Sequence, residues 1–90
     1  MLFLNLIKNN RQKTKSVIGL VIPSNWDANN NITGVSILTD LEEEYIVNNQ
    51  NTNLLNETNN KIKAKGLITP IGAGKSKINI IKYKLIRKFK

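Results

Sequence analysis

The segment Gly72-Ala73-Gly74-Lys75-Ser76 contains the residue types of a phosphate-binding loop. Such a loop needs a glycine five residues before its Gly-Lys pair, with a strand before it and a helix after it. Backbone amides and the helix N-terminus then surround the phosphate. The required position holds Thr69, and the alternation of Ile78-Asn79-Ile80 predicts a strand rather than a helix. We therefore interpret these residues as a hairpin turn and not as a nucleotide site.

The acidic residues Asp40, Glu42, Glu43 and Glu44 form a second group with chemical potential. Paired carboxylates can perform acid–base chemistry or bind Mg²⁺ and Ca²⁺. No second acidic cluster completes such a site, so a solvated strand edge is the simpler interpretation. The chain has no histidine and no cysteine, which removes the commonest general base, thiolate chemistry and the usual zinc ligands. The sequence thus predicts no enzyme, no catalytic residue, no metal site and no cofactor.

The basic C-terminal third carries more functional information. From Lys61 onward the chain has ten positive residues and no acid, within a formal net charge of +8. In Lys61–Ile68 the lysines alternate with smaller or apolar residues, so they share one strand face. If the last two strands are neighbours, their lysines form one positive surface that attracts phosphate without sequence preference. A base would need an aromatic side chain on which to stack, and Trp26 is a candidate. The predicted nucleic-acid-binding residues are Trp26, Lys63, Lys65, Lys75, Lys77, Lys82 and Lys84.

Strands must position these side chains, and the hydrophobic pattern predicts five of them. They cover residues 16–22, 32–39, 43–47, 61–68 and 75–88. Gly19 predicts a bulge or a sharp coil, and Pro23-Ser24-Asn25 is expected to end the first strand, which places Trp26 in the following loop. A short helix near Thr52 is expected to depend on tertiary packing by Leu54-Leu55, because so few residues cannot hold a helix alone.

The last predicted strand changes its phase. Ile78 and Ile80 face one way, whereas Tyr83 and Leu85 fall in the opposite phase. One extra residue within a strand produces such a change, so we predict a β-bulge near Ile81-Lys82.

The predicted elements follow the order of three strands, a short helix and two strands. This order, with Val17-Ile18-Gly19-Leu20-Val21, Gly34-Val35-Ser36-Ile37 and Glu44-Tyr45-Ile46-Val47, resembles many small bacterial OB-fold domains. The resemblance implies an all-β, five-stranded Greek-key barrel with one short helix between strands three and four. It implies a domain over residues 15–90 that follows an N-terminal arm over residues 1–14. A small SH3-like barrel is the alternative fold, although it usually lacks the helix.

OB-folds bind oligonucleotides mainly on strands two and three and with the loops that follow strands one and four. In this chain Glu42, Glu43 and Glu44 lie on that face, and basic residues do not. The resemblance therefore implies a fold and no particular activity. The charge distribution instead predicts a binding module for single-stranded nucleic acid or another polyanion whose basic surface lies away from the usual face, or a basic surface that serves solubility or a protein partner.

The alternative function is a protein–protein interaction module with an acidic partner and no nucleic-acid ligand. Phe3, Leu4 and Ile7 of the N-terminal arm, or Trp26, would then be the anchors. The apolar start of the chain precedes its positive charges, whereas a signal peptide has its charges first, so the sequence predicts a cytoplasmic protein. No apolar run is long enough to predict a membrane span.

Overall fold

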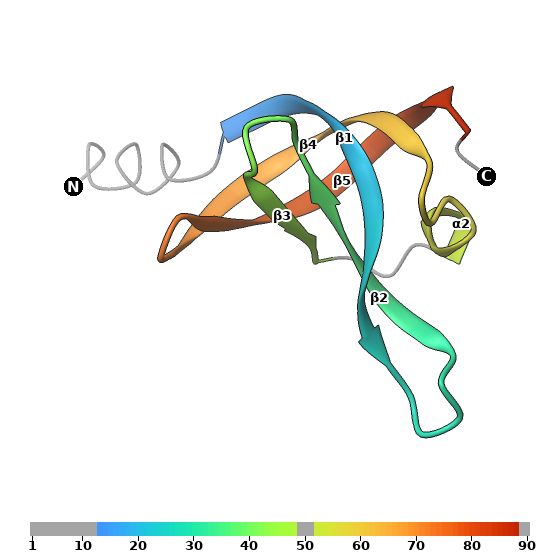
Figure 1. The fold of residues 1–90 in the computed structure, drawn as a ribbon. Helices are drawn as coiled ribbons and strands as arrows, with labels where there is room; N and C mark the ends of the chain where they lie inside the picture. The colour runs from blue at the N-terminus through green and yellow to red at the C-terminus, as the bar shows by residue number, and fades with distance from the viewer. Residues whose placement is uncertain (1–12, 49–51, 89–90) are drawn as a thin grey trace.

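A computed structural model describes residues 13–48 and 52–88 (Figure 1). The proposed anchors Phe3, Leu4 and Ile7 lie outside the described residues, as do the first twelve positions of the predicted arm. The elements are β1 (Lys13–Trp26), β2 (Ile32–Leu38), β3 (Glu44–Val47), α2 (Thr52–Leu55), β4 (Lys61–Gly72) and β5 (Lys75–Arg87). The expected all-β class is confirmed for this part of the chain, as is a short helix between the third and fourth strands.

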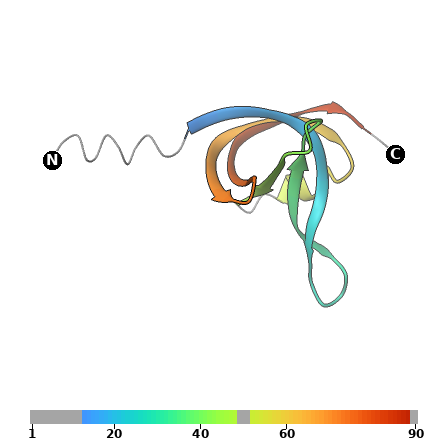
Figure 2. The ribbon, with the colours of Figure 1, turned by 60° about the vertical axis from the view of Figure 1, so that its left-hand side comes forward.

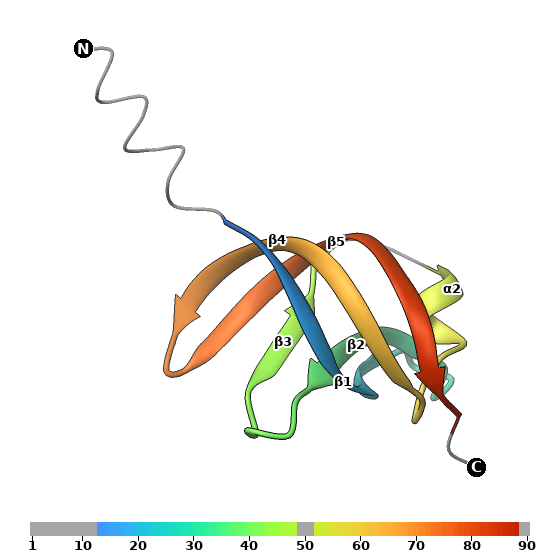
Figure 3. The same ribbon diagram turned by 90° about the horizontal axis from the view of Figure 1, so that it is seen from above.

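The five strands form one closed sheet in the order β1-β2-β3-β5-β4. Every neighbouring pair is antiparallel except β3 and β5, which run parallel. The long strand β1 serves both sides of the sheet, because Lys13–Leu20 pairs with β4 and Leu20–Trp26 pairs with β2. Figure 2 shows β1 curving across the molecule before it enters the projecting β1–β2 hairpin. In Figure 3, β4 and β5 lie side by side along most of their length.

The hairpin between β1 and β2 is longer in its strands and shorter in its loop than predicted. Pro23 does not end β1, since the register with β2 shifts on either side of Asn25 and such irregularities tolerate proline. Trp26 is therefore the last residue of a strand and not part of a loop. The Asp27 carboxylate accepts hydrogen bonds from the backbone amides of Asn31 and Asn29, at 2.9 and 2.8 Å, and these bonds lower the pKa of Asp27.

The segment with phosphate-loop residue types is a hairpin turn, as predicted. Strand β4 continues to Gly72, and β5 begins at Lys75. Gly72, Ala73 and Gly74 have positive φ angles of 99, 53 and 75 degrees, a backbone conformation that glycine adopts without steric cost. Strand β5 follows the turn directly, so the described residues do not place a helix N-terminus after it as a phosphate-binding loop requires.

The core fills the inside of the closed sheet. Val21, Ile37, Ile62 and Ile78 are fully buried, and Leu54 of α2 is buried with them. Burial of each such side chain contributes roughly 1.5–3 kcal/mol. A four-residue helix has no stability of its own in water. The buried Leu54 supplies the predicted tertiary packing.

Gly19 and Gly66 let strands approach one another closely. A Cβ at Gly19 would collide with the Leu38 carbonyl, and one at Gly66 would collide with the Asn79 carbonyl. Of the two predicted alternatives for Gly19, the bulge is wrong, because the β1–β4 register runs through this residue without a shift. The sharp coil stays a prediction at the point where β1 changes its partner from β4 to β2. The close packing of two backbones explains the glycine instead.

Within the described residues, no helix is long and apolar enough to cross a lipid bilayer.

Candidate functional site

Four lysines from neighbouring strands surround one open hollow on the outside of the sheet. The hollow has a volume of about 370 Å³ and is lined by Ser16, Lys63, Lys65, Lys82, Tyr83 and Lys84. Strand β1 contributes the serine, β4 contributes two lysines, and β5 contributes the other two with the tyrosine. We call the outward side of β1, β4 and β5 around these four lysines the lysine face.

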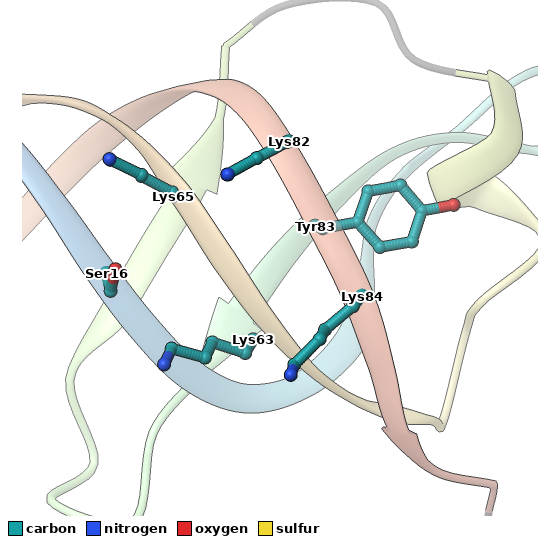
Figure 4. Close-up of a pocket in the computed structure, with 6 residues that line it drawn as sticks. All are labelled: Ser16, Lys63, Lys65, Lys82, Tyr83 and Lys84. Carbon is teal, nitrogen blue, oxygen red and sulfur yellow. The ribbon is translucent and has the colours of Figure 1, made fainter.

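Strand register arranges the lysine face in two rows. Lys65 pairs with Ser16 on one side and with Lys82 on the other. Lys63 pairs in the same way with Ile18 and with Lys84. Figure 4 shows the two rows, with the ammonium groups of Lys65 and Lys82 in one and those of Lys63 and Lys84 in the next. Two residues of antiparallel strand separate the rows, a spacing of roughly 6.8 Å.

Alternation along β4 accounts for half of this arrangement. Ile62 and Ala64 are fully buried, whereas Lys63 and Lys65 are exposed. This is the predicted division of the strand into one apolar face and one basic face.

A β-bulge in β5 accounts for the other half. Lys65 pairs with Lys82 and the next residue, Gly66, pairs with Ile80, which leaves Ile81 as the extra residue. The bulge predicted near this position is thereby confirmed. Ile80 points inward before the bulge, so without the extra residue Lys82 would also point inward. The bulge therefore brings Lys82 to the outside with the lysines of β4.

The electrostatics of the lysine face are one-sided. Strands β1, β4 and β5 contain no aspartate or glutamate. Lys65 stands directly opposite Lys82 and Lys63 directly opposite Lys84. Like charges in directly opposed positions are unfavourable by about 0.2–1 kcal/mol per pair. An anion held between the rows would replace this repulsion with attraction.

Tyr83 lines the hollow only with the part of the residue nearest the backbone. Its ring points away from the four ammonium groups, toward α2 (Figure 4). The ring is partly buried against the core, and this burial raises the pKa of Tyr83, with a smaller contribution from Glu57. The ring of Tyr83 is thus a core side chain and does not offer its face to a ligand among the lysines.

Of the seven predicted site residues, the structure brings together Lys63, Lys65, Lys82 and Lys84. Lys77 pairs with Thr69 near the β4–β5 turn, and Lys75 begins β5 beside that turn. Lys77 is five residues from Lys82, roughly 17 Å along an extended strand. These two lysines lie on β5 but outside the hollow.

Trp26 is also separate from the four lysines. It ends β1, eight residues after Ile18, which is the partner of Lys63. This separation is roughly 27 Å along the strand. The side chain is 55% exposed and stands next to the β1–β2 turn. Its exposure suits contact with a ligand or partner, although not in the hollow.

Sequence reasoning missed Ser16 and Ile18. Both are exposed on β1, and Ile18 is 45% exposed beside the lysine rows. Their alternation with buried Val17 signals an outward face, but only the pairing of β1 with β4 places that face beside lysines.

Lys15 has a partner of its own. Its Nζ donates a hydrogen bond to the Tyr45 hydroxyl at 3.2 Å and lies 5.7 Å from the centroid of that ring. Because the hydroxyl stands at the ring edge, this contact is a hydrogen bond rather than a cation over the ring face. It raises the pKa of Lys15, and the charge of Glu43 adds a smaller effect.

The outside of β1, β2 and β3 has a different chemistry. Inward Val21, Ile37 and Tyr45 alternate with outward side chains, so Ile22, Ser36 and Ile46 form one outward row across the three strands. Leu20, Leu38 and Glu44 form the next row. We call these two rows the aliphatic face. The Ser36 hydroxyl is fully buried between its neighbours and has no hydrogen-bond partner among the described residues.

Residues 13–48 and 52–88 contain no cluster of acidic side chains arranged to hold a metal ion. Neither a scan of known protein families nor searches of curated proteins and of solved structures finds a match to this chain. The site must therefore be interpreted from its own geometry and charge.

Proposed function

We propose that this chain is an OB-fold binding module that holds a polyanion, such as single-stranded nucleic acid, on its lysine face. Four lysines around one hollow, on strands without a single acid, are the observation that supports this function most directly. A surface of this kind binds phosphates through charge, without base-specific contacts.

The strand arrangement supports the OB-fold assignment. A closed sheet in the order β1-β2-β3-β5-β4, with a helix between β3 and β4, is the arrangement that the resemblance implies. The usual ligand face over β2 and β3 is the aliphatic face in this chain, so we assign the ligand to the opposite chemistry on β4 and β5.

Fluorescence anisotropy with a labelled oligonucleotide tests the proposal. Binding is expected at about 50 mM salt, with a log–log salt slope near −2.8 if each of the four lysines contacts one phosphate. In the variant Lys63→Gln/Lys65→Gln the slope should fall by about 1.4 and the affinity at least about tenfold.

The matched control is Lys75→Gln/Lys77→Gln, which removes the same charge from the same sheet but outside the hollow. A smaller loss in this control supports the lysine face. The proposal is wrong if no binding occurs at about 50 mM salt. Equal losses in the two variants would instead indicate a diffuse positive field with no defined site.

A second candidate is a protein partner with an acidic surface. Ile18 and Ile81 are 45% and 62% exposed beside the lysines, and a phosphate chain would leave these apolar side chains without a function. An acidic peptide with aliphatic residues would cover them. This candidate is favoured if such a peptide binds at low salt while the oligonucleotide does not.

A further inference from the structure

The side chains around the hollow indicate which part of a ligand the lysine face contacts, an inference that rests on the proposed function. The hollow offers ammonium groups in two rows but no aromatic face on which a base could stack. Among the described residues, the chain has three aromatic side chains. Tyr45 is buried, Tyr83 points toward α2, and Trp26 lies at the end of β1 (Figure 4).

Apart from the lysines, side chains that could recognise base edges are equally scarce. Ser16 is the one uncharged polar side chain that lines the hollow besides Tyr83. A single hydroxyl can donate to or accept from any base, so it carries little sequence information. Stacking and base-edge hydrogen bonds are the two ways in which single strands are normally distinguished from other polyanions. The lysine face lacks the first. For the second it offers one serine and the lysine ammonium groups, which can donate to base edges but are flexible point charges that bind phosphate equally well.

The lysine rows instead repeat in a line along two strands. Lys65 and Lys82 form one row, Lys63 and Lys84 form the next, and Lys61 pairs with Arg87 beyond them. The first two rows are separated by roughly 6.8 Å along the strands, and a register shift between Lys61 and Ile62 adds one residue of β5 before Arg87. A chain of phosphates lying along β4 and β5 can meet the rows one after another. A compact anion reaches one or two rows at most.

We propose that the ligand is a linear phosphate chain recognised through its phosphates alone, lying along β4 and β5. A nucleic-acid backbone and inorganic polyphosphate share this chemistry. The bases of a nucleic acid would then point away from the sheet and contribute nothing to the affinity.

Competition against a labelled oligothymidylate of about ten nucleotides tests this proposal. The competitors are an abasic phosphodiester of the same length, inorganic polyphosphate of the same length, and pyrophosphate. We expect the abasic chain to compete within about threefold of the unlabelled oligothymidylate, and pyrophosphate to compete at least about tenfold less well. Lys63→Gln/Lys65→Gln should lower the affinity for the oligothymidylate, the abasic chain and polyphosphate by the same factor. Circular dichroism would establish that this variant is folded.

The competition strengths of the abasic chain and of pyrophosphate test the two parts of the proposal separately. An abasic chain that competes more than about tenfold less well than the oligothymidylate shows that bases contribute, and overturns the proposal while the proposed function stands. Pyrophosphate that competes equally well overturns the linear chain.

The two sources of phosphate are separated by the polyphosphate arm. If polyphosphate and the abasic chain compete equally well, the lysine face recognises phosphate from either source. If polyphosphate competes clearly better than the abasic chain, the inorganic chain is the ligand. If the oligothymidylate itself does not bind, direct titration of polyphosphate decides. Binding of polyphosphate alone keeps the phosphate-chain proposal and removes nucleic acid from the proposed function. Absence of any binding overturns both.

Discussion

The aliphatic face and the lysine face share strand β1 but differ in what they offer a ligand. Beside β2, outward Leu20 and Ile22 of β1 share their rows with aliphatic side chains, the small Ser36 and one acid, Glu44, and Leu20 also pairs with Lys61 of β4. Beside β4, outward Ser16 and Ile18 meet only lysines in the same rows. Two to six residues of one strand therefore separate two surfaces of different chemistry.

This difference decides which side of the sheet suits the proposed ligand. The proposed OB-fold assignment would place the usual ligand face over β2 and β3, yet the acidic turn that joins those strands would repel phosphate. The cations collect on β4 and β5 instead. Function depends on the side chains that a fold presents, and the same fold can present them on either side.

The largest expected effect concerns the backbone contact that shapes the lysine face. Gly66→Ala should destabilise the protein by roughly 1–3 kcal/mol, because the new Cβ collides with the Asn79 carbonyl beside the bulge. The midpoint of urea unfolding measures this change. Ser16→Ala, an exposed change on the same face, should stay within about 0.5 kcal/mol and serves as the control. A loss for Gly66→Ala no larger than for this control would show that β4 and β5 do not approach so closely.

A smaller effect of opposite sign is expected on the aliphatic face. The Ser36 hydroxyl is buried with no hydrogen-bond partner among the described residues, and such a group is unfavourable. Ser36→Ala should therefore stabilise the protein by about 1 kcal/mol in the same unfolding experiment. Ser16→Ala removes an exposed hydroxyl, so the difference between the two variants gives the part of the change in stability that is due to burial of the Ser36 hydroxyl. A destabilised Ser36→Ala variant would show that the hydroxyl has a favourable partner in solution.

The smallest effect should come from two acids, Glu44 on the aliphatic face and Glu43 next to it in the chain. Glu43→Gln/Glu44→Gln should change oligonucleotide affinity by less than about twofold at physiological salt, where the Debye length is about 8 Å. The expected loss in Lys63→Gln/Lys65→Gln is far larger, although both variants change two charges. Anisotropy under one set of conditions compares them directly. If Glu43→Gln/Glu44→Gln bound the oligonucleotide tenfold more tightly, the two faces would act as one electrostatic field.

Local patterns predicted several parts of the structure correctly. The alternation in Lys61–Ile68 separated buried Ile62 and Ala64 from exposed lysines, because side chains alternate in any strand. The change of phase predicted the bulge around Ile81, since only an extra residue reverses the alternation. These inferences needed no knowledge of neighbouring strands.

Residues that depend on distant partners were harder to predict. Pro23 was expected to end β1, but β2 supplies an irregular partner that accommodates it. Gly19 was expected to allow a bulge or a sharp coil. No bulge forms there, and the missing Cβ makes room for the Leu38 carbonyl. In both cases the reason lies on another strand.

The sequence by itself determined five strands, a helix that needs Leu54 for its packing, and a basic surface on the last two strands. Tertiary structure decided which lysines share a hollow, that Ser16 lies among them, and that Trp26 and the ring of Tyr83 do not. The physical reason is the range of the interactions. Alternation and phase are set by neighbours along the chain, whereas the register that places Lys63 opposite Lys84 is set by contacts between strands.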